Sequence, residues 1–238
     1  MPTFTHGSNA VVLLDKTNLS TTLTDASFSG LSDIVETSTF ASTSKSYVPG
    51  LKDNTATMSG YFETSSPDAD AEFLSQLGGS GAAYSIAPIG YTRGNPLDFG
   101  TTIETSYDKS ADINSLVSVA VALQFSGDAY NGKSLVAPAA FTATSTETSV
   151  DFGATGSSGG AAVLHVTAKS GTSPQVIAKI QHSSNDSSWS DYLTFTTATA
   201  ETSEIKTSDS SVNRYIRAVL TISGSTPSLT IAVGFAQQ

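Results

Sequence analysis

The chain contains no cysteine, a single tryptophan, two methionines and few charges for its length. Without cysteine, neither a disulfide framework nor a thiolate metal site can form. Charged residues make up 13% of the 238 residues, whereas a typical soluble domain has about 25%. Because lone charges are costly to bury, such a hydroxyl-rich, sparsely charged chain is typical of a subunit that its neighbours largely cover. The composition also fits a secreted β protein.

No apolar stretch is long enough to span a bilayer, and residues 1–7 lack the basic and apolar regions of a signal peptide. We therefore expect no membrane insertion, and a protein that is made and kept in a cytoplasm.

The net charge of -10 is unevenly distributed. Residues 1–138 contain six Lys and Arg against fourteen Asp and Glu, a balance of -8, and residues 139–238 contain five against seven, a balance of -2. Binding nucleic acid through its phosphates needs clustered Lys and Arg. The acidity argues against such binding, but it is compatible with DNA that passes nearby without being held.

The most informative local pattern is the run over residues 115–127. As an extended strand it places large apolar side chains on one face, at Val117, Val119, Val121, Leu123 and Phe125. Burial of this face would contribute roughly 8 to 15 kcal/mol, at about 1.5 to 3 kcal/mol per side chain. The other face is small and uncharged, which suits packing against another chain or lining a surface that must not bind.

Similar short runs, separated by Gly, Pro, Asn or Asp, predict an antiparallel β domain in residues 1–138. The predicted strands are 11–14, 34–40, 55–63, 83–91, 101–107 and 115–126. One short α-helix is predicted over about residues 67–77, with Ser66 as its cap and Pro67 at its first position. Its buried stripe would consist of Ala69, Phe73, Leu74 and Leu77.

Residues 139–160 are rich in Ser, Thr and Gly and predict a seam or linker. Beyond them, alternation around residues 162–168, 176–180, 216–222 and 229–235 predicts a small Ig-like or jelly-roll-like β-sandwich over 161–238. The expected fold class is therefore mainly β, with a β-sandwich or barrel that carries one helix followed by a second sandwich.

Candidate catalytic and metal-binding patterns each have a structural interpretation. The run 156–160 matches the nucleophile elbow G-x-S-x-G, which needs a strand-to-helix turn, but a strand is predicted to follow. Of the histidines, His6 lies in a terminal arm, His165 is expected to point outward from a strand, and His182 adjoins a turn, so none has metal-ligand spacing. We expect no catalytic site, no metal, no cofactor and no enzymatic activity.

Trp189 and Tyr192 follow a polar turn and are candidates for weak stacking on a glycan. A tryptophan in this position more often caps the core of a sandwich.

Several motifs resemble the major tail tube proteins of bacteriophages with long, non-contractile tails, the siphophages. They are Tyr47-Val-Pro-Gly-Leu-Lys-Asp-Asn54, Thr57-Met-Ser-Gly-Tyr-Phe62 and the acidic helix with Phe73 and Leu74. The later part, with Ile180-Gln-His-Ser-Ser-Asn-Asp186 and Asn213-Arg-Tyr-Ile-Arg217, resembles a sandwich domain often appended to phage virion proteins.

The resemblance implies subunit rings, expected to be sixfold, whose inner strands join edge to edge and which stack into a hollow tube in the virion tail. Double-stranded DNA would pass through the lumen without specific binding. The expected partners are other copies of the chain and the tape measure, tail tip and tail terminator proteins, after assembly in the host cytoplasm. The other classes that fit are a capsid decoration or head-associated protein and a carbohydrate-binding adhesin module.

The resemblance also implies contact segments. An N-terminal arm with Phe4 and His6, and a loop over about residues 37–54, would bind neighbouring subunits or the next ring. The candidate loop residues are Lys45, Tyr47, Pro49, Leu51 and Lys52. The second domain would project outward, where it could contact host-surface glycans weakly.

A tube that conducts DNA is expected to repel phosphate, and an acidic wall acts over a Debye length of about 8 Å. This range suffices in a narrow bore. The candidate lumen carboxylates are Asp33, Glu36, Asp98, Glu104, Asp108 and Asp112.

Overall fold

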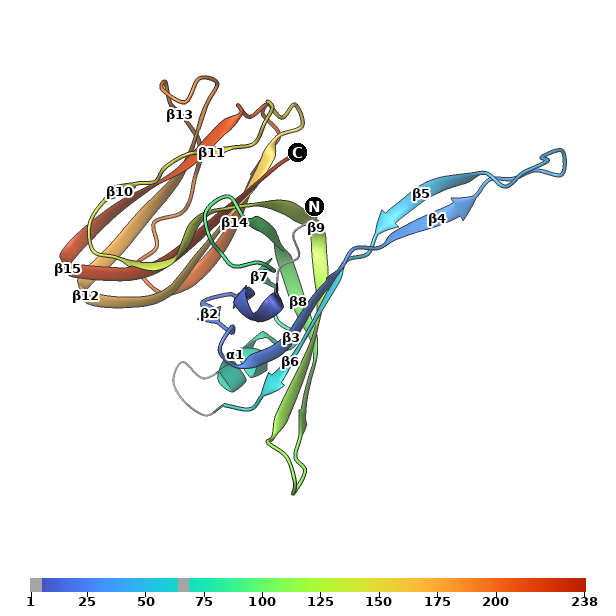
Figure 1. The fold of residues 1–238 in the computed structure, drawn as a ribbon, viewed down its shortest axis with the longest axis horizontal. Helices are drawn as coiled ribbons and strands as arrows, with labels where there is room; N and C mark the ends of the chain where they lie inside the picture. The colour runs from blue at the N-terminus through green and yellow to red at the C-terminus, as the bar shows by residue number, and fades with distance from the viewer. Residues whose placement is uncertain (1–5, 64–68) are drawn as a thin grey trace. The chain divides into compact units, whose positions relative to one another are not determined.

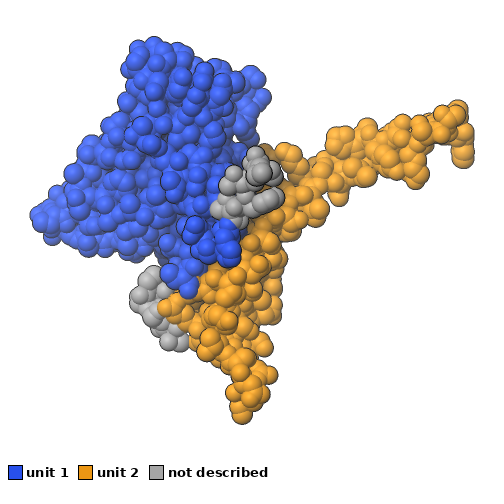
Figure 2. Space-filling view, in the orientation of Figure 1, with its two compact units in different colours: residues 1–21, 82–100, 130–238 blue, residues 22–81, 101–129 orange. Residues whose placement is uncertain are grey.

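The computed structural model describes residues 6–63 and 69–238. The described chain is mainly β, as predicted, with one 3-10 turn, η1 (Gly7–Asn9), and one α-helix, α1 (Ala69–Gln76). It forms two compact units, each discontinuous in sequence. Unit 1 comprises residues 1–21, 82–100 and 130–238, and unit 2 comprises residues 22–81 and 101–129 (Figure 2).

Unit 1 is built around two long strands, β12 (Gly160–Ser183) and β15 (Tyr215–Gln237), which pair antiparallel along most of their length (Figure 1). The later part of β9 (Ser118–Phe141) pairs with β15. The other strands with residues in unit 1 are β1 (Val11–Leu14), β2 (Thr17–Asn18), β7 (Ala82–Ala87), β8 (Pro96–Ser110), β10 (Ser145–Thr146), β11 (Val150–Asp151), β13 (Ser190–Thr194) and β14 (Thr202–Ser208).

The core of unit 1 follows the predicted alternation. Ala162, Leu164 and Val166 of β12 are wholly buried, and two alternating runs of β15, over 216–222 and 229–235, lie in the same core. Ala168, which the prediction also placed inward, is exposed. Because successive side chains of a strand point to opposite faces, this local period was readable from the sequence.

The compact units divide the chain differently from the predicted domains. Strands β10 and β11 lie inside the predicted seam over 139–160, and both pair with β15. Leu135 and Val136, on the other side of the predicted boundary, are buried in the same core as Val150. The division at residues 138 and 161 stays a prediction about which parts fold independently.

Unit 2 contains a sheet in the order β3-β6-β9-β8, with β3 (Leu23–Ser29) and β6 (Thr55–Tyr61) joined to the first part of β9 and the last part of β8. One face carries its core. The buried apolar side chains of this unit are Ala56, Met58, Ala69, Phe73, Val119, Val121, Leu123 and Phe125.

Helix α1 buries a different set of residues from the predicted one. Ala69, Glu72 and Phe73 are its buried residues, whereas Leu74 and Leu77 are half exposed, so the predicted stripe was wrong at these two positions. The helix ends at Gln76, and only one i, i+3, i+4 set faces inward in so short an element. The predicted cap, Ser66 with Pro67, lies outside the described residues. Within those residues, no helix has the length and apolarity to cross a membrane.

Gly60 of β6 lies where two backbones approach closely. A Cβ at this position would lie 2.2 Å from the carbonyl oxygen of Thr22 and 2.8 Å from Cα of Leu23. We therefore expect Gly60→Ala to lower the free energy of unfolding by roughly 1 to 3 kcal/mol, measured by urea denaturation. Gly7→Ala, which would meet no atom within 4 Å, is the control and should leave it unchanged. Equal midpoints would show that β3 can move away from β6 here without cost.

Strands β4 (Ser32–Glu36) and β5 (Tyr47–Lys52) form a separate two-stranded sheet, which we call the arm. The chain passes from β3 directly into β4, and from β5 directly into β6 (Figure 1). Within the described residues, β4 and β5 pair with each other alone. The arm is therefore a thin projection of unit 2 (Figure 2).

Candidate functional site

The second face of the unit 2 sheet is small, hydroxylated and almost uncharged, and we call it the smooth face. The strand register sets Asp25 of β3 beside Ser59 of β6 and Ala120 of β9, and the next row is Ser27, Thr57 and Ala122. On β3, β6 and β9 this face consists of Asp25, Ser27, Ser29, Thr55, Thr57, Ser59, Tyr61, Ser118, Ala120, Ala122 and Gln124, with the exposed ring of Tyr61 at one end. Asp25 is the one charged residue in it.

A shallow hollow of about 300 Å³ lies on the smooth face. Its lining includes Asp25, Thr57, Ser59, Ser106 and Ala122, with no aromatic or cationic side chain in it. Stacking platforms hold nucleic-acid bases and cations hold phosphates, so this lining offers a nucleic acid neither kind of contact.

The buried face beneath confirms the alternation predicted for this run. Val119, Val121, Leu123 and Phe125 are buried, and the Phe125 ring meets Phe28 edge to face at 5.4 Å. Val117 departs from the prediction because β9 begins one residue later, and its side chain is 38% exposed.

The arm exposes apolar side chains on both of its faces. Residues directly opposite in an antiparallel pair share a face, so Ile34 with Pro49 and Val35 with Val48 mark the two faces. Leu51 is 82% exposed, and Phe40 at the tip is fully exposed. An isolated two-stranded hairpin is marginally stable in water, and this one has nothing from its own chain to cover it among the described residues.

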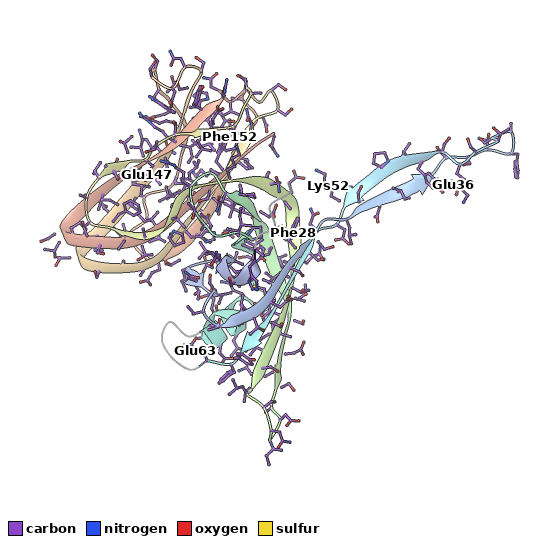
Figure 3. All side chains as sticks on the ribbon, in the orientation of Figure 1. Phe28, Glu36, Lys52, Glu63, Glu147 and Phe152 are labelled. Atoms are coloured by element: carbon purple, nitrogen blue, oxygen red, sulfur yellow. The ribbon has the colours of Figure 1, made fainter. Side chains whose placement is uncertain are left out.

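The predicted contact loop therefore lies on this arm as a β-hairpin. Lys45 pairs with Glu36 across the hairpin at 2.9 Å, and Lys52 lies 3.8 Å from Asp128. Figure 3 labels Glu36 and Lys52, both on the arm. Tyr47 and Pro49 face Glu36 and Ile34. The prediction missed β5 because Pro49 and Gly50 are unfavourable in a strand, although an edge position tolerates both.

Four of the six candidate lumen carboxylates lie on exposed segments of unit 2. Asp33 and Glu36 are on the arm, Asp108 is near the end of β8, and Asp112 is in the turn that joins β8 to β9. Asp98 belongs to unit 1, where Asn131 donates to it at 2.6 Å and partial burial raises its pKa. The lumen carboxylates predicted from the sequence did not include Asp25, because strand β3 was not predicted.

Glu104 is the clear exception among these carboxylates. Its side chain is 2% exposed and lies on the core face of β8, whereas the next residue, Thr105, donates to the carbonyl oxygen of Ala122 at 3.0 Å. It does not present its charge on a surface of this chain. Burial and the charge of Glu72 raise the pKa of Glu104 to about 7.

The remaining predicted site residues are held by local contacts. His6 accepts from the backbone N–H of Ser8 through Nδ1, and Phe4 lies outside the described residues. Tyr192 donates to the carbonyl oxygen of Ser210 at 2.8 Å and packs edge to face on Phe235. One face of the Trp189 ring is covered by the Arg217 guanidinium, 4.1 Å from its centroid.

His165 is wholly buried, so the expectation that it points outward was wrong. Its Nδ1 lies 2.7 Å from the carbonyl oxygen of Asp15, and its Nε2 lies 2.9 Å from Oγ of Ser85. Ser203 donates to the Asp15 carboxylate at 2.7 Å. The network ties β7, β12, β14 and the turn after β1 together within unit 1, and desolvation lowers the pKa of His165 to about 4.

A serine beside a histidine is also the geometry of an activated nucleophile. Here both Ser85 and His165 have no exposed surface, so the pair has no opening to a substrate in this conformation. We interpret the pair as part of a structural hydrogen-bond network.

No protein-family profile matches the sequence, and no curated protein sequence matches it. Solved structures are similar to it. A chain in the virion of a native gene transfer agent particle is 16% identical, with a TM-score of 0.43 over 53% of this chain and 97% of that one. The tail tube of phage SPP1 is 12% identical, with a TM-score of 0.43 over 54% of this chain and 78% of that one.

The Dit protein of SPP1, a hub of the adsorption apparatus in phages that infect Gram-positive bacteria, is similar over a longer stretch. It is 7% identical, with a TM-score of 0.37 over 96% of this chain and 99% of that one. The similar structures thus include a tail tube, the class that the sequence motifs resemble.

Proposed function

We propose that this chain is the major tail tube subunit of a siphophage. In this proposal it forms rings, sixfold as the sequence resemblance implies, which stack into a hollow tube that conducts the phage DNA. It is a structural protein of the virion and performs no catalysis.

The observation that carries the proposal is the combination of a smooth face with an open edge in unit 2. Within the described residues, β3 pairs with β6 on one side and with no strand on the other. An unpaired edge is a template for a strand of another chain, and closure into a ring removes such edges. A closed ring of these sheets would have the smooth face as one continuous wall.

The smooth face has the chemistry that a DNA conduit needs. Apart from the Tyr61 ring at one end, its hydroxyl, methyl and amide groups give no firm hold to bases or phosphates, and each copy of Asp25 adds a negative charge to the wall. Because screening limits repulsion to about 8 Å, such charges act in a narrow bore. Asp33, Glu36, Asp108 and Asp112 would add to the wall wherever the ring turns them inward.

The arm supplies the contact between subunits. A ribbon with apolar side chains on both faces loses its exposed apolar surface when it lies between two other surfaces. Burying the exposed apolar side chains of the arm, such as Ile34, Val48 and Leu51, would contribute roughly 5 to 10 kcal/mol per arm before the entropic cost of association. In a contact of this kind apolar burial supplies most of the attraction, beside the charged side chains of Glu36, Lys45 and Lys52 that the arm also carries.

Electron microscopy of the purified chain tests the proposal. We expect rings or hollow tubes at high protein concentration, with unit 2 sheets lining the bore in an averaged map. A map with the smooth face of unit 2 away from the bore would contradict the lining. A monomer that binds a capsid lattice, or one that binds glycans saturably without assembling, would favour the decoration or the adhesin function instead.

A further inference from the structure

One acid in the core of unit 2 has no hydrogen-bond partner. Glu104 of β8 is 2% exposed, and both of its carboxylate oxygens are buried without a partner among the described residues. A negative charge that is buried without a partner is costly, and a carboxyl group avoids this cost by keeping its proton. The position of Glu104 therefore favours its neutral form.

Helix α1 and the residues that follow it contact β8 at this position. Leu77 forms a parallel β-bridge with Glu104, and the N–H of Gly78 donates to the carbonyl oxygen of Glu104 at 3.2 Å. Further along β8, the ring of Tyr107 contacts the ring of Phe73 in α1, with the two centroids 5.2 Å apart. The contacts that hold the helix on the strand thus lie at Glu104 and beside it.

The charged groups near Glu104 come from α1 and β8. Burial, and after it the negative charge of Glu72 in α1, raise the pKa of Glu104 to about 7. Lys109 of β8 forms an ion pair with Asp70 of α1, and the hydroxyl of Tyr107 donates to the same carboxylate. The buried side chains that β6 and β9 supply to this core are apolar. The positive charge of Lys109 is therefore engaged by Asp70, and Glu104 faces a negative charge.

We propose that protonation of Glu104 controls the docking of helix α1 on β8: the neutral acid keeps the helix docked, and ionisation of the acid loosens the helix from the sheet. Helix α1 has eight residues, and so short a helix depends on its packing for stability. Local opening of one small element brings water to the carboxylate while the sheet stays folded. The device lies within one subunit and does not depend on ring assembly.

The sign of the pH dependence follows from the docked and open forms. In the open form Glu104 is solvated and its pKa returns to the ordinary value of 4.5, whereas in the docked form it is about 7. Between these two values the docked form holds a proton that the open form has lost, so a rise in pH favours opening. The equilibrium constant for opening should grow about tenfold per pH unit in this window, on the order of 100-fold in all, and stay level outside it.

Amide hydrogen exchange of the full, unassembled chain tests the proposal. Protection factors, corrected for the intrinsic effect of pH on exchange, are measured from pH 4.5 to 8. We expect the protection of residues 69–79 to fall on the order of 100-fold up to pH 7 and then to stay level. Residues 119–125 of β9, which remain in the folded sheet, should lack this fall.

The decisive variant is Glu104→Gln, which keeps the shape of the side chain and stays neutral at every pH. Its helix should remain as protected at pH 8 as the wild-type helix at pH 4.5. Asp108→Asn, which changes an exposed acid of the same strand, is the matched control and should follow the wild type. Glu104→Met, also neutral, takes the place of the glutamine variant if that chain does not fold.

Carbon-13 NMR of the glutamate carboxyl carbons measures the protonation of Glu104 directly. Its signal is identified by its absence from the Glu104 variant, and we expect a titration midpoint near 7. Glu72→Gln should lower this midpoint without returning it to 4.5, because burial is the larger cause of the shift.

Two results would overturn the proposal. A wild-type Glu104 that titrates near 4.5 while the helix stays docked would show that the core holds the ionised acid without loosening. Helix exchange with the same pH dependence in wild type and Glu104→Gln would show that another group governs the opening. If Glu72→Gln then abolished that dependence, the controlling proton would belong to Glu72.

Discussion

A chain without the arm is expected to remain folded and to form no rings or tubes. The variant replaces residues 31–52 by a short Asn-Gly turn between Gly30 and Asp53, which suits a two-residue hairpin. Since β4 and β5 pair only with each other in the described chain, their removal leaves the register of β3 with β6 intact. Loss of assembly should be complete, because the deletion removes the apolar ribbon that carries Ile34, Val48 and Leu51, for which the described chain has no substitute.

Size-exclusion chromatography with light scattering and electron microscopy measure this result, with circular dichroism as the test of fold. A milder double variant tests whether assembly needs the apolar side chains of the arm and not merely its length. Ile34→Ser with Leu51→Ser removes apolar contact from an arm of normal length and should also abolish tubes. Thr37→Ala, also exposed on the hairpin, is the control and should assemble normally. Wild-type tubes from the arm-deleted chain would exclude the arm from the subunit contacts.

Acidification from pH 6.5 to 4 is expected to cost the wild-type chain about 3 kcal/mol through His165 alone. The pKa of this histidine falls from 6.5 in the unfolded chain to about 4 in the folded one. In that window the unfolded state binds a proton that the folded state does not, so the free energy of unfolding falls as the pH falls. The loss is absent above pH 6.5 and complete below pH 4.

The cause of this shift is desolvation, which the carbonyl and the carboxylate of Asp15 offset only in part. Chemical denaturation across the window, compared between wild type and His165→Gln, isolates the effect, because carboxylates such as Asp151 titrate in both chains. The variant should be less stable at neutral pH by roughly 1 to 3 kcal/mol and should lack the histidine slope.

His6→Gln serves as the control for His165, since His6 is exposed and should leave the slope as in wild type. Parallel pH profiles for wild type and His165→Gln would show that His165 becomes charged in the folded state without cost. The hydrogen-bond network of Asp15, Ser85 and His165 would then be open to water.

The strand pattern of the chain could be predicted wherever alternation is strong. Residues 119–125 and 162–166 were assigned to the correct faces because the period of two is a local property of an extended backbone. The arm was predicted in part, as a strand near residue 34 followed by a contact loop. Strand β3 was missed because its Ser, Thr and Asp residues resemble a loop in composition.

Other features depended on contacts distant in sequence. Glu104 and His165 were expected at surfaces, and both are buried by elements that the sequence does not place beside them, α1 and the turn at Asp15. Leu74 and Leu77 fit a buried stripe, yet the helix turns another set inward. The boundary at residue 138, drawn on composition, stays a prediction; that β8 and β9 each pass through both compact units was not readable from the sequence.

By itself, the sequence determined a mainly β chain without disulfides, an acidic first part, and a core strand with a small, uncharged outer face, since these follow from composition and local period. Tertiary structure alone decided which strand edge stays open, which apolar residues the arm leaves uncovered, and which acid and histidine are buried. Those outcomes depend on strand pairing between distant segments, whose free energy no local pattern records.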